Sequence, residues 1–372
     1  MSGSKDQILV QTLEHLKKLV AFDTQNPPRD ISSEGGIIEY LKNNLPGFEF
    51  TLYDAGDGCM ALLAERGKTE RLYNFHIDTV PVAPGWERDP FALSIEGDKA
   101  YGLGSCDIKG ASASMLTAAS LTEGPLALLF STDEEHGSSL AVKNFLNQNS
   151  NYSEVIVSEP TMAAARVAHR GIQSAKVNFT GRSGHASEAR AIEDNAIHKQ
   201  SQWLNKVLQS LKASTASYKT LKGVPFNVGK IEGGIKNNMI AASCELTFGF
   251  RPLPGMDSKL MLDDMKADAA ALGYTNDFTL EPMFFGPTLP AANQDFNEAL
   301  NAAEQLADKC AIPIGEPVNF WTEASLFSEA GMTALVYGPG NIEQAHTADE
   351  WVALEQLEKI TNHYIAMINS TN

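Results

Sequence analysis

Residues 125–135 read Pro-Leu-Ala-Leu-Leu-Phe-Ser-Thr-Asp-Glu-Glu, a continuous apolar run that ends in an acidic cluster. A short run that is apolar on both faces predicts a strand buried on both sides, which is typical of parallel sheets covered by helices. Similar apolar stretches and helical stretches alternate along the chain at 71–75, 108–121, 140–146, 154–157 and 334–337. This alternation predicts an α/β domain whose mostly parallel sheet is flanked by helices.

The pattern changes near residue 171, where strands of alternating polarity surround one long helical stretch. These segments lie at 175–179, 195–211, 226–231 and 244–250. Alternating strands indicate a sheet with one exposed face, so a smaller α+β domain with an open antiparallel sheet is expected here. The α/β pattern then returns, which indicates that the second domain interrupts the first. We expect residues 1–170 and 286–372 to form the larger domain and 171–285 the inserted one.

Composition limits the possible partners of the chain. The 372 residues include 29 Lys and Arg and 46 Asp and Glu, which gives a net charge of −17. Nucleic acids and anionic membranes both require clustered positive charge, so neither is an expected partner. No apolar run approaches the roughly 20 residues of a membrane helix. Residues 1–24 have helical periodicity and lack the features of a signal peptide.

The four cysteines are far apart in the sequence and include no Cys-x-x-Cys pair. They are Cys59, Cys106, Cys244 and Cys310. This spacing indicates thiols in a reducing compartment, so a cytoplasmic location is expected.

Histidines and carboxylates lie where the predicted strands end. His76 and Asp78 are two residues apart on an extended segment, so they share a face. A metal-binding histidine commonly donates its second ring N–H to a carboxylate, which suits this spacing. Taken alone, the pair is equally compatible with a surface histidine beside an aspartate in a turn.

A glycine-rich turn at 102–110 presents Asp107 at the start of a predicted helix. The turn is not a nucleotide-binding fingerprint, because Asp107 replaces the third glycine, and it is not a P-loop. Taken alone, Asp107 could simply be a helix cap with no further role. However, Glu134, Glu135 and Glu159 also follow buried strands, and the carboxyl ends of parallel strands share one sheet edge.

His346, in a polar loop near the C-terminus, completes the set of candidate ligands. Mixed histidine and carboxylate ligands favour zinc, cobalt or manganese over calcium. A carboxylate with further ligands on each side suits two metal ions about 3.5–4 Å apart. The sequence therefore predicts a two-metal site.

At these positions the sequence resembles the dinuclear-metal amidohydrolases of the M20 peptidase group. The motifs that carry the resemblance are His76-Ile77-Asp78-Thr79-Val80-Pro81, Gly102-Leu103-Gly104-Ser105-Cys106-Asp107-Ile108-Lys109-Gly110, Thr132-Asp133-Glu134-Glu135, Ser158-Glu159-Pro160-Thr161 and Ala345-His346-Thr347. The match runs over nearly the whole chain. Within the group, the sequence is most similar to the deacetylases that act on acetylornithine and acetylcitrulline.

The resemblance implies two divalent metal ions, Zn²⁺ or Co²⁺. It implies that His76 and Glu159 hold one ion, that Glu135 and His346 hold the other, and that Asp107 bridges them. Glu134 is implied as the general base and Asp78 as the residue that orients His76. Contributions from the inserted domain and the later loops are also implied: His185 in the site of its own or a partner subunit, and Arg251, Asn238, Gly338 and Glu323 in substrate binding.

The activity implied is removal of the Nα-acetyl group of an acetylated amino acid in arginine biosynthesis. Acetylornithine is the first candidate substrate and acetylcitrulline the alternative; a desuccinylase acting on succinyl-diaminopimelate or a dipeptidase is more distant. Glu323 would favour the cation of ornithine but could also bind a neutral ureido group. A non-catalytic binding module is disfavoured, because the base and every ligand position are present. The resemblance also implies a homodimer, in which the inserted domain at 171–285 serves as a dimerisation or lid domain.

Overall fold

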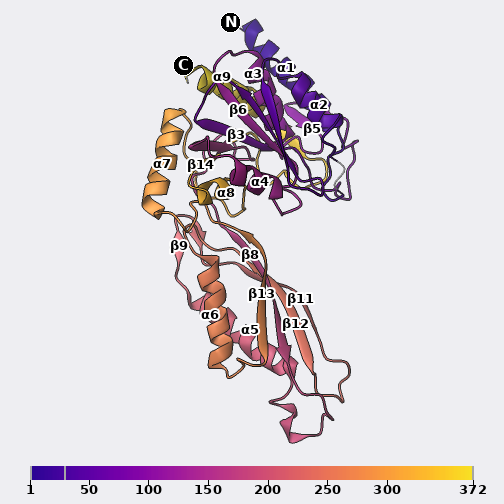
Figure 1. Cartoon of the computed structure of the whole chain (residues 1–372). Helices are drawn as coiled ribbons and strands as arrows, with labels where there is room; N and C mark the ends of the chain where they lie inside the picture. The colour runs from indigo at the N-terminus through magenta and orange to yellow at the C-terminus, as the bar shows by residue number, and fades with distance from the viewer. Residues whose placement is uncertain (1, 29–30, 371–372) are drawn as a thin grey trace. The chain divides into compact units, whose positions relative to one another are not determined.

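A computed structural model describes residues 2–28 and 31–370 of the chain (Figure 1). The chain forms two compact units. Unit 1 comprises Met1–Val167, Asn297–Gly315 and Thr322–Asn372, and unit 2 comprises Ala168–Phe296 and Glu316–Trp321.

Unit 1 is built on a six-stranded sheet of order β1-β2-β6-β3-β7-β14. Strands β3 (Arg71–His76), β6 (Leu126–Ser131), β7 (Glu154–Val157) and β14 (Thr333–Val336) pair in parallel, which confirms the predicted mostly parallel sheet. Strands β1 (Glu49–Asp54) and β2 (Met60–Arg66), which were not predicted, add an antiparallel edge. In register, His76 lies opposite Ser131 and Asn74 opposite Val157, so β3, β6 and β7 end close together.

Helices cover both faces of this sheet (Figure 1). On one face, α1 (Ser2–Val20), α3 (Lys109–Ser120) and α9 (Leu354–Asn369) pack against each other. Buried threonine hydroxyls join the three helices: Thr12 Oγ1 lies 3.1 Å from Thr117 Oγ1 and 3.2 Å from Thr361 Oγ1. The remaining helices are α2 (Gly36–Asn43), α4 (Leu140–Gln148), α7 (Phe296–Lys309) and α8 (Ala324–Glu329).

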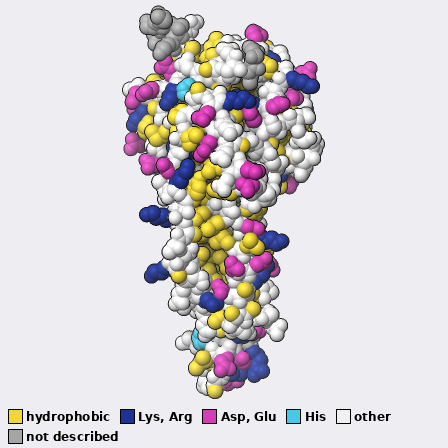
Figure 2. Space-filling view, turned by 90° about the vertical axis from the view of Figure 1, so that its left-hand side faces the viewer, with side chains coloured by type: hydrophobic (Ala, Val, Ile, Leu, Met, Phe, Trp, Pro, Cys, Tyr) yellow, Lys and Arg dark blue, Asp and Glu magenta, His cyan; other side chains and the backbone are white. Residues whose placement is uncertain are grey.

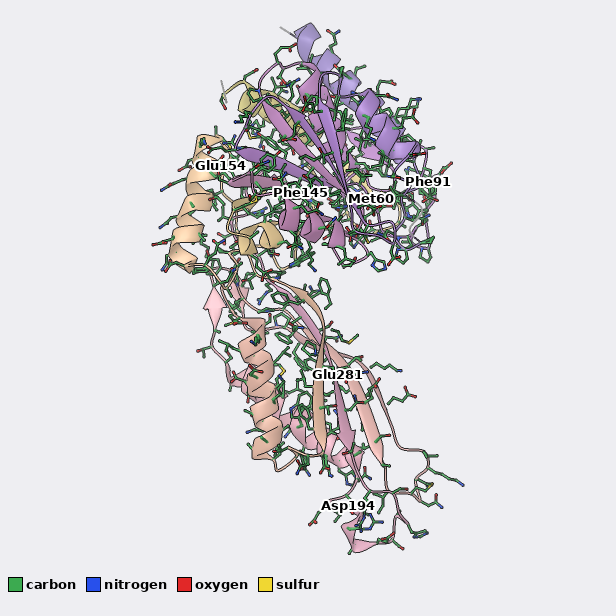
Figure 3. The ribbon with its side chains drawn as sticks, in the orientation of Figure 1. Met60, Phe91, Phe145, Glu154, Asp194 and Glu281 are labelled. Carbon is green, nitrogen blue, oxygen red and sulfur yellow. The ribbon has the colours of Figure 1, made fainter. Side chains whose placement is uncertain are left out.

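Helix α4 lies against the opposite face, near β1 and β2. Its Phe145 side chain (Figure 3) is buried, with ring centroids 5.2 Å from Tyr53 and 6.5 Å from Phe327. Aromatic contacts of this kind tie α4 to the sheet edge and to α8.

A second, three-stranded sheet in unit 1 has the order β15-β5-β4. Strands β4 (Ser94–Glu96) and β5 (Lys99–Tyr101) form a hairpin, and β15 (Trp351–Ala353) pairs antiparallel with β5. The pairing places the segment that follows β5 beside the segment that precedes β15. These two segments carry Asp107 and His346.

Unit 2 contains a four-stranded antiparallel sheet of order β11-β12-β8-β13. Its strands are β8 (Ile172–Thr180), β11 (Phe226–Gly233), β12 (Ser243–Phe250) and β13 (Phe278–Gly286), and its helices are α5 (Ala196–Ala213) and α6 (Ser258–Ala271). Two short strands, β9 (Ser217–Tyr218) and β10 (Leu221–Lys222), and a 3₁₀ turn at Ala189–Ala191 complete the unit. Alternate residues of β8 are buried, as predicted from its polarity pattern. Trp203 and Phe248 lie in the core between sheet and helices.

Helix α6 and strand β13 are the longest elements of unit 2 that were not predicted. Helix α6 buries few large side chains, chiefly Leu262 and Met265, so its periodicity is weak. Strand β13 contains Pro282, which cannot donate a backbone hydrogen bond and is uncommon inside a sheet. The structure accommodates it at a sheet edge, where the register shifts between Pro282 and Phe285.

The boundary of unit 2 also differs from the expected range of 171–285. His169 and Leu289 exchange backbone hydrogen bonds of 3.0 and 3.2 Å, and Val318 N–H donates to Ala168 O at 3.2 Å. The Trp321 ring packs edge-on against Phe284. These contacts attach residues beyond β13 and a short later segment to unit 2.

The surface agrees with the composition. On the face seen in Figure 2, acidic side chains are interspersed with Lys and Arg and form no single patch. Within residues 2–28 and 31–370, no helix is long and apolar enough to cross a membrane.

Candidate dinuclear metal centre

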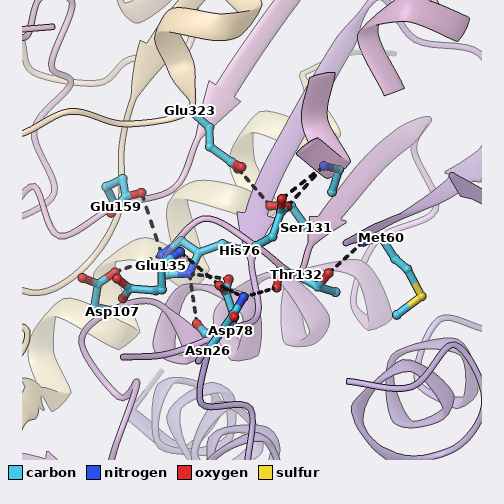
Figure 4. A network of polar contacts seen from close by, with 12 residues as sticks. Asn26, Met60, His76, Asp78, Asp107, Ser131, Thr132, Glu135, Glu159 and Glu323 are labelled. Carbon is cyan, nitrogen blue, oxygen red and sulfur yellow. Dashed lines mark hydrogen bonds and ion pairs between the residues drawn. The ribbon is translucent and has the colours of Figure 1, made fainter. Parts of the chain in front are cut away.

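The predicted ligands come together at the carboxyl edge of the main sheet in unit 1. Figure 4 shows four of them, His76, Asp107, Glu135 and Glu159. His76 is the last residue of β3, and Glu135 and Glu159 follow β6 and β7. Asp107 precedes α3, and His346 lies in the loop before β15. Because β6, β3 and β7 are neighbours in the sheet, their ends present these side chains in one place.

Asp107 lies between the two histidines. Its Oδ1 is 3.0 Å from His76 Nε2, and its Oδ2 is 3.4 Å from His346 Nε2. His76 Nε2 is also 3.8 Å from Glu159 Oε1, and His346 Nε2 is 3.0 Å from Glu135 Oε1. Each oxygen of one carboxylate thus faces a separate histidine–glutamate pair, as a bridging ligand would.

The grouping of donor atoms agrees with this arrangement. One cluster contains His76, Asp107 and Glu159, and another contains Asp107, Glu135 and His346; in each, the donor atoms lie within 4.8 Å of one another. A third cluster of the same kind joins Glu134 to His76 and Glu135. Two clusters that share Asp107 fit two metal ions.

The electrostatics of the site also favour cations. Burial raises the pKa of Glu134 and Glu159 well above the ordinary glutamate value, and the neighbouring acids Glu135 and Asp107 add to the effect. Hydrogen bonds to Asp107 and Glu135 raise the pKa of His346 to about 11. Burial opposes the charge of His76, yet hydrogen bonds to Asp107 and Asp78 hold its pKa well above its ordinary value. Divalent cations would relieve this concentration of buried carboxylates.

Asp78 supports the site in a way that differs in detail from the prediction. His76 Nδ1 lies 3.1 Å from the backbone carbonyl oxygen of Asp78 and 3.6 Å from its carboxylate. The fully buried carboxylate instead accepts hydrogen bonds from Asn26 Nδ2 at 3.1 Å and from Glu135 N–H at 3.0 Å. The backbone carbonyl of Asp78 thus makes the closer contact with His76, and the Asp78 side chain also holds the segment that carries Glu135. Asn26 was not identified from sequence, where nothing near it indicates a function.

Two predicted substrate-binding positions of unit 1 are buried. Glu323 is 1% exposed, and its Oε2 accepts a hydrogen bond of 2.8 Å from Ser131 Oγ. Burial raises the pKa of Glu323 to about 7. The Gly338 N–H donates to Thr161 Oγ1 at 3.0 Å, so it is used within the fold.

The other predicted positions lie in unit 2. His185 is exposed, and its Nδ1 is 2.7 Å from Ser187 Oγ. A β-bridge between His185 and Met239 places His185 beside exposed Asn238, before β12 begins. Arg251 follows the other end of β12. At about 3.3 Å per residue, this strand separates Arg251 from the other two residues by roughly 25 Å.

Comparisons with known proteins agree with this fold. The sequence profile described as Peptidase family M20/M25/M40 matches residues 72–370. The chain is 46% identical over 367 residues to N-acetyl-L-citrulline deacetylase of Xanthomonas campestris pv. campestris, with 98% of this chain and 99% of the relative covered. It is 35% identical over 300 residues to acetylornithine deacetylase of Salmonella arizonae, with 74% of each covered.

Solved structures share the fold. Aminopeptidase PepT from Bacillus cereus superposes with a TM-score of 0.75 at 18% identity, with 98% of each chain covered. The YXEP protein of Bacillus subtilis, described as a dinuclear metal binding peptidase from the M20 family, gives a TM-score of 0.67 at 14% identity, again with 98% of each chain covered.

The chain belongs to peptidase family M20/M25/M40. It is a hydrolase that acts on amide bonds, and both sequence relatives described above are deacetylases. The resemblance read from the sequence motifs is therefore confirmed.

Proposed function

We propose that this chain is a metal-dependent deacetylase that removes the Nα-acetyl group of N-acetyl-L-citrulline. The observation that carries the proposal is the arrangement of Asp107 between two histidine–glutamate pairs, in a chain that matches an N-acetyl-L-citrulline deacetylase over nearly its full length. The sequence motifs had placed acetylornithine first and acetylcitrulline second. The higher identity to the acetylcitrulline enzyme reverses this order, and acetylornithine is the second candidate.

The position of Glu323 supports the reversed order. An anion in the substrate pocket would favour the cationic side chain of ornithine. Glu323, the predicted anion, is buried and hydrogen-bonded to Ser131, and burial raises its pKa to about 7. A carboxyl group that is buried and hydrogen-bonded within the fold is not presented to a substrate side chain, so it gives the ammonium group of ornithine no specific advantage over the neutral ureido group of citrulline.

The proposed chemistry assigns separate tasks to neighbouring residues. Two divalent cations, Zn²⁺ or Co²⁺, held by His76, Glu159, Asp107, Glu135 and His346, would polarise the amide carbonyl and acidify a water molecule. The Glu134 carboxylate accepts the proton of the attacking water and delivers it to the leaving amine. Its raised pKa, caused by burial and by Glu135, suits a group that must both accept and donate a proton.

Arg251 is proposed to bind the α-carboxylate of the substrate. Burial lowers the pKa of its guanidinium, and among the described residues no acid forms an ion pair with it. A partly desolvated guanidinium without an acidic partner favours a carboxylate ligand, with which it can form two parallel hydrogen bonds.

A homodimer is proposed on the geometry of unit 2. Arg251 and the pair His185 and Asn238 lie at opposite ends of β12. An acetylated amino acid is too small to span roughly 25 Å, so it cannot contact all three residues of one chain. We propose that His185 and Asn238 act in the site of a second copy, where His185 stabilises the negative charge on the carbonyl oxygen.

The proposed substrate places the enzyme in arginine biosynthesis in the cytoplasm. The cysteines support a reducing compartment, because all four are buried and none forms a disulfide within the described residues.

Parallel measurements of kcat/KM on four substrates test the proposal. The substrates are N-acetyl-L-citrulline, N2-acetyl-L-ornithine, succinyl-diaminopimelate and a dipeptide, each assayed with protein of known metal content. We expect N-acetyl-L-citrulline to exceed acetylornithine by at least about tenfold, which is about 1.4 kcal/mol in transition-state stabilisation. A tenfold preference for acetylornithine would restore the first sequence-based candidate, and activity on the dipeptide alone would refute the deacetylase proposal.

A further inference from the structure

Glu350 carries a buried carboxylate that is hydrogen-bonded to the backbone of the turn that presents Asp107. Its side chain is 2% exposed and accepts three backbone hydrogen bonds from that turn. Gly104 N–H donates to Oε2 at 2.8 Å, and Cys106 and Asp107 N–H donate to Oε1 at 2.8 and 2.9 Å. One of the three donors is therefore the amide of the bridging residue itself.

The small sheet of unit 1 sets the position of Glu350. Pairing of β15 with β5 aligns Trp351 with Tyr101, and the ladder continues one step further, where Gly102 N–H donates to Glu350 O at 3.0 Å. Ser105 Oγ donates to the same carbonyl oxygen at 3.3 Å. Both the main chain and the side chain of Glu350 thus hold residues 102–107.

Glu350 also follows His346 within one loop. That loop carries a candidate ligand of one metal, and the turn at 102–107 carries the ligand that both metals would share. The contacts of Glu350 therefore join the two segments at the point where their ligands meet.

The turn has little freedom to adopt another shape. Gly104 has a φ of 77°, and a Cβ there would lie 2.8 Å from Thr79 Cγ2 and 3.0 Å from Lys109 Cδ. A Cβ at Gly110 would lie 2.4 Å from Ser105 O. The close packing and the three convergent N–H groups form a preformed anion-binding concavity, which Glu350 fills.

Placing a second acid beside Asp107 is electrostatically unfavourable. Burial and the charge of Asp107 raise the pKa of Glu350 to about 8, while the three N–H groups favour its ionised form. An apolar side chain at this position would leave three buried N–H groups without a partner.

We propose that Glu350 is a positioning residue for the metal centre, which fixes the backbone of the turn so that the two Asp107 oxygens face His76 and His346. This inference rests on the proposed dinuclear site. It predicts that Glu350 controls metal affinity although it is not itself a ligand. Outer partners of metal ligands commonly change affinity or activity by about 10–100-fold when they are replaced.

Glu350→Gln tests the proposal. The glutamine amide supplies one acceptor oxygen, so its NH₂ group must face at least one of the three N–H donors. A matched control is Asp349→Asn, the adjacent residue in the same loop. Asp349 Oδ1 also accepts two backbone hydrogen bonds, from Glu87 and Arg88 N–H at 3.2 Å each, but these donors lie outside the ligand-bearing turn.

The measurement is Co²⁺ binding to the metal-free protein, followed by calorimetry and by visible absorption. Thermal unfolding of each metal-free variant shows whether it is folded. We expect Glu350→Gln to weaken Co²⁺ binding by about 10–100-fold and to change the absorption spectrum, and Asp349→Asn to remain within about twofold of the unmodified protein.

Each outcome has a distinct meaning. Wild-type affinity and spectrum in folded Glu350→Gln would overturn the inference, as would an equal loss in Asp349→Asn. Should Glu350→Gln fail to fold, Glu350→Asp replaces it: the shorter arm keeps the charge but cannot reach all three donors, so a folded variant with unchanged affinity would also overturn it. Failure of the unmodified protein to bind Co²⁺ would instead refute the dinuclear site, and the inference with it.

Discussion

Glu134 and Glu135 are adjacent acids whose substitution we expect to affect metal binding differently: replacing Glu134 should leave it unchanged, and replacing Glu135 should weaken it. Glu135 Oε1 is 3.0 Å from His346 Nε2, whereas no described side chain forms a hydrogen bond or ion pair with the Glu134 carboxylate. Both nevertheless belong to one cluster of possible donors with His76. Distances alone therefore do not distinguish the proposed base from the proposed ligand. Substitutions that preserve side-chain size can distinguish them.

Glu134→Gln preserves the side-chain volume and removes the basic group. General acid–base catalysis typically contributes 10²–10⁴-fold, so we expect kcat to fall by that factor, about 3–5 kcal/mol in activation free energy. The variant should keep both metal ions. Glu135→Gln replaces an anionic ligand by a neutral amide. It should lower the affinity for one metal ion by more than the roughly 100-fold that is typical when a hydrogen-bonding partner of a ligand is replaced.

Metal content by atomic emission, Co²⁺ titration of the metal-free protein and steady-state kinetics on N-acetyl-L-citrulline would be measured for both variants. Loss of a metal ion from Glu134→Gln would show that Glu134 is a ligand. A kcat within about threefold of the unmodified enzyme in Glu134→Gln would refute its role as the base. Full metal content in Glu135→Gln would refute the assignment of the second ion.

Three further substitutions test other parts of the structure. Arg251→Ala should lower kcat/KM by about 10–100-fold, mainly through KM and with metal content unchanged, because a charged hydrogen-bonding partner of the substrate is lost; an unchanged KM would contradict this. The Trp203 ring is buried in the unit 2 core and its Nε1–H donates to Met265 O at 2.9 Å. Trp203→Ala should therefore lower the free energy of unfolding by about 3–5 kcal/mol in urea, and a loss below about 1 kcal/mol would contradict this packing. Burial lowers the pKa of His169 from 6.5 to about 4, so the unfolded state binds a proton more readily than the folded state does. The free energy of unfolding should therefore fall as the pH drops from about 6.5 to 4, by roughly 3 kcal/mol at most. His169→Asn should flatten this slope in the metal-free protein, and an unaltered slope would contradict the assignment.

The buried strands could be predicted, and candidate ligands could be located at their ends, because the signals for both are local. The apolar run at β6 and the acids after it are contiguous, so one stretch of sequence specifies both the strand and the site. The same holds for His76 at the end of β3. Continuous hydrophobicity also separates these parallel strands from the alternating strands of unit 2.

Other features depend on tertiary contacts that leave no local signal. Proline is a residue type that argues against a strand, yet an edge position and a register shift accommodate Pro282 within β13. Glu350 occurs in an acidic, polar stretch typical of a surface loop. Its burial follows only from the pairing of β15 with β5, which brings a distant turn against it. Similarly, spacing placed Asp78 near His76 but could not show that the backbone carbonyl makes the closer contact.

The division of unit 1 into separate stretches of the chain has a consequence for synthesis on the ribosome. Most of unit 2 is a single continuous segment that emerges before β14, the His346 loop, β15 and α9. Domains generally fold as units while the chain is being made. Unit 2 can therefore fold at a stage when the sheet of unit 1 still lacks strand β14 and helix α3 still lacks α9, the helix that packs against it. The candidate metal centre lacks His346 until its loop has left the exit tunnel, so the full set of proposed ligands is not available to the nascent chain before unit 2 has emerged.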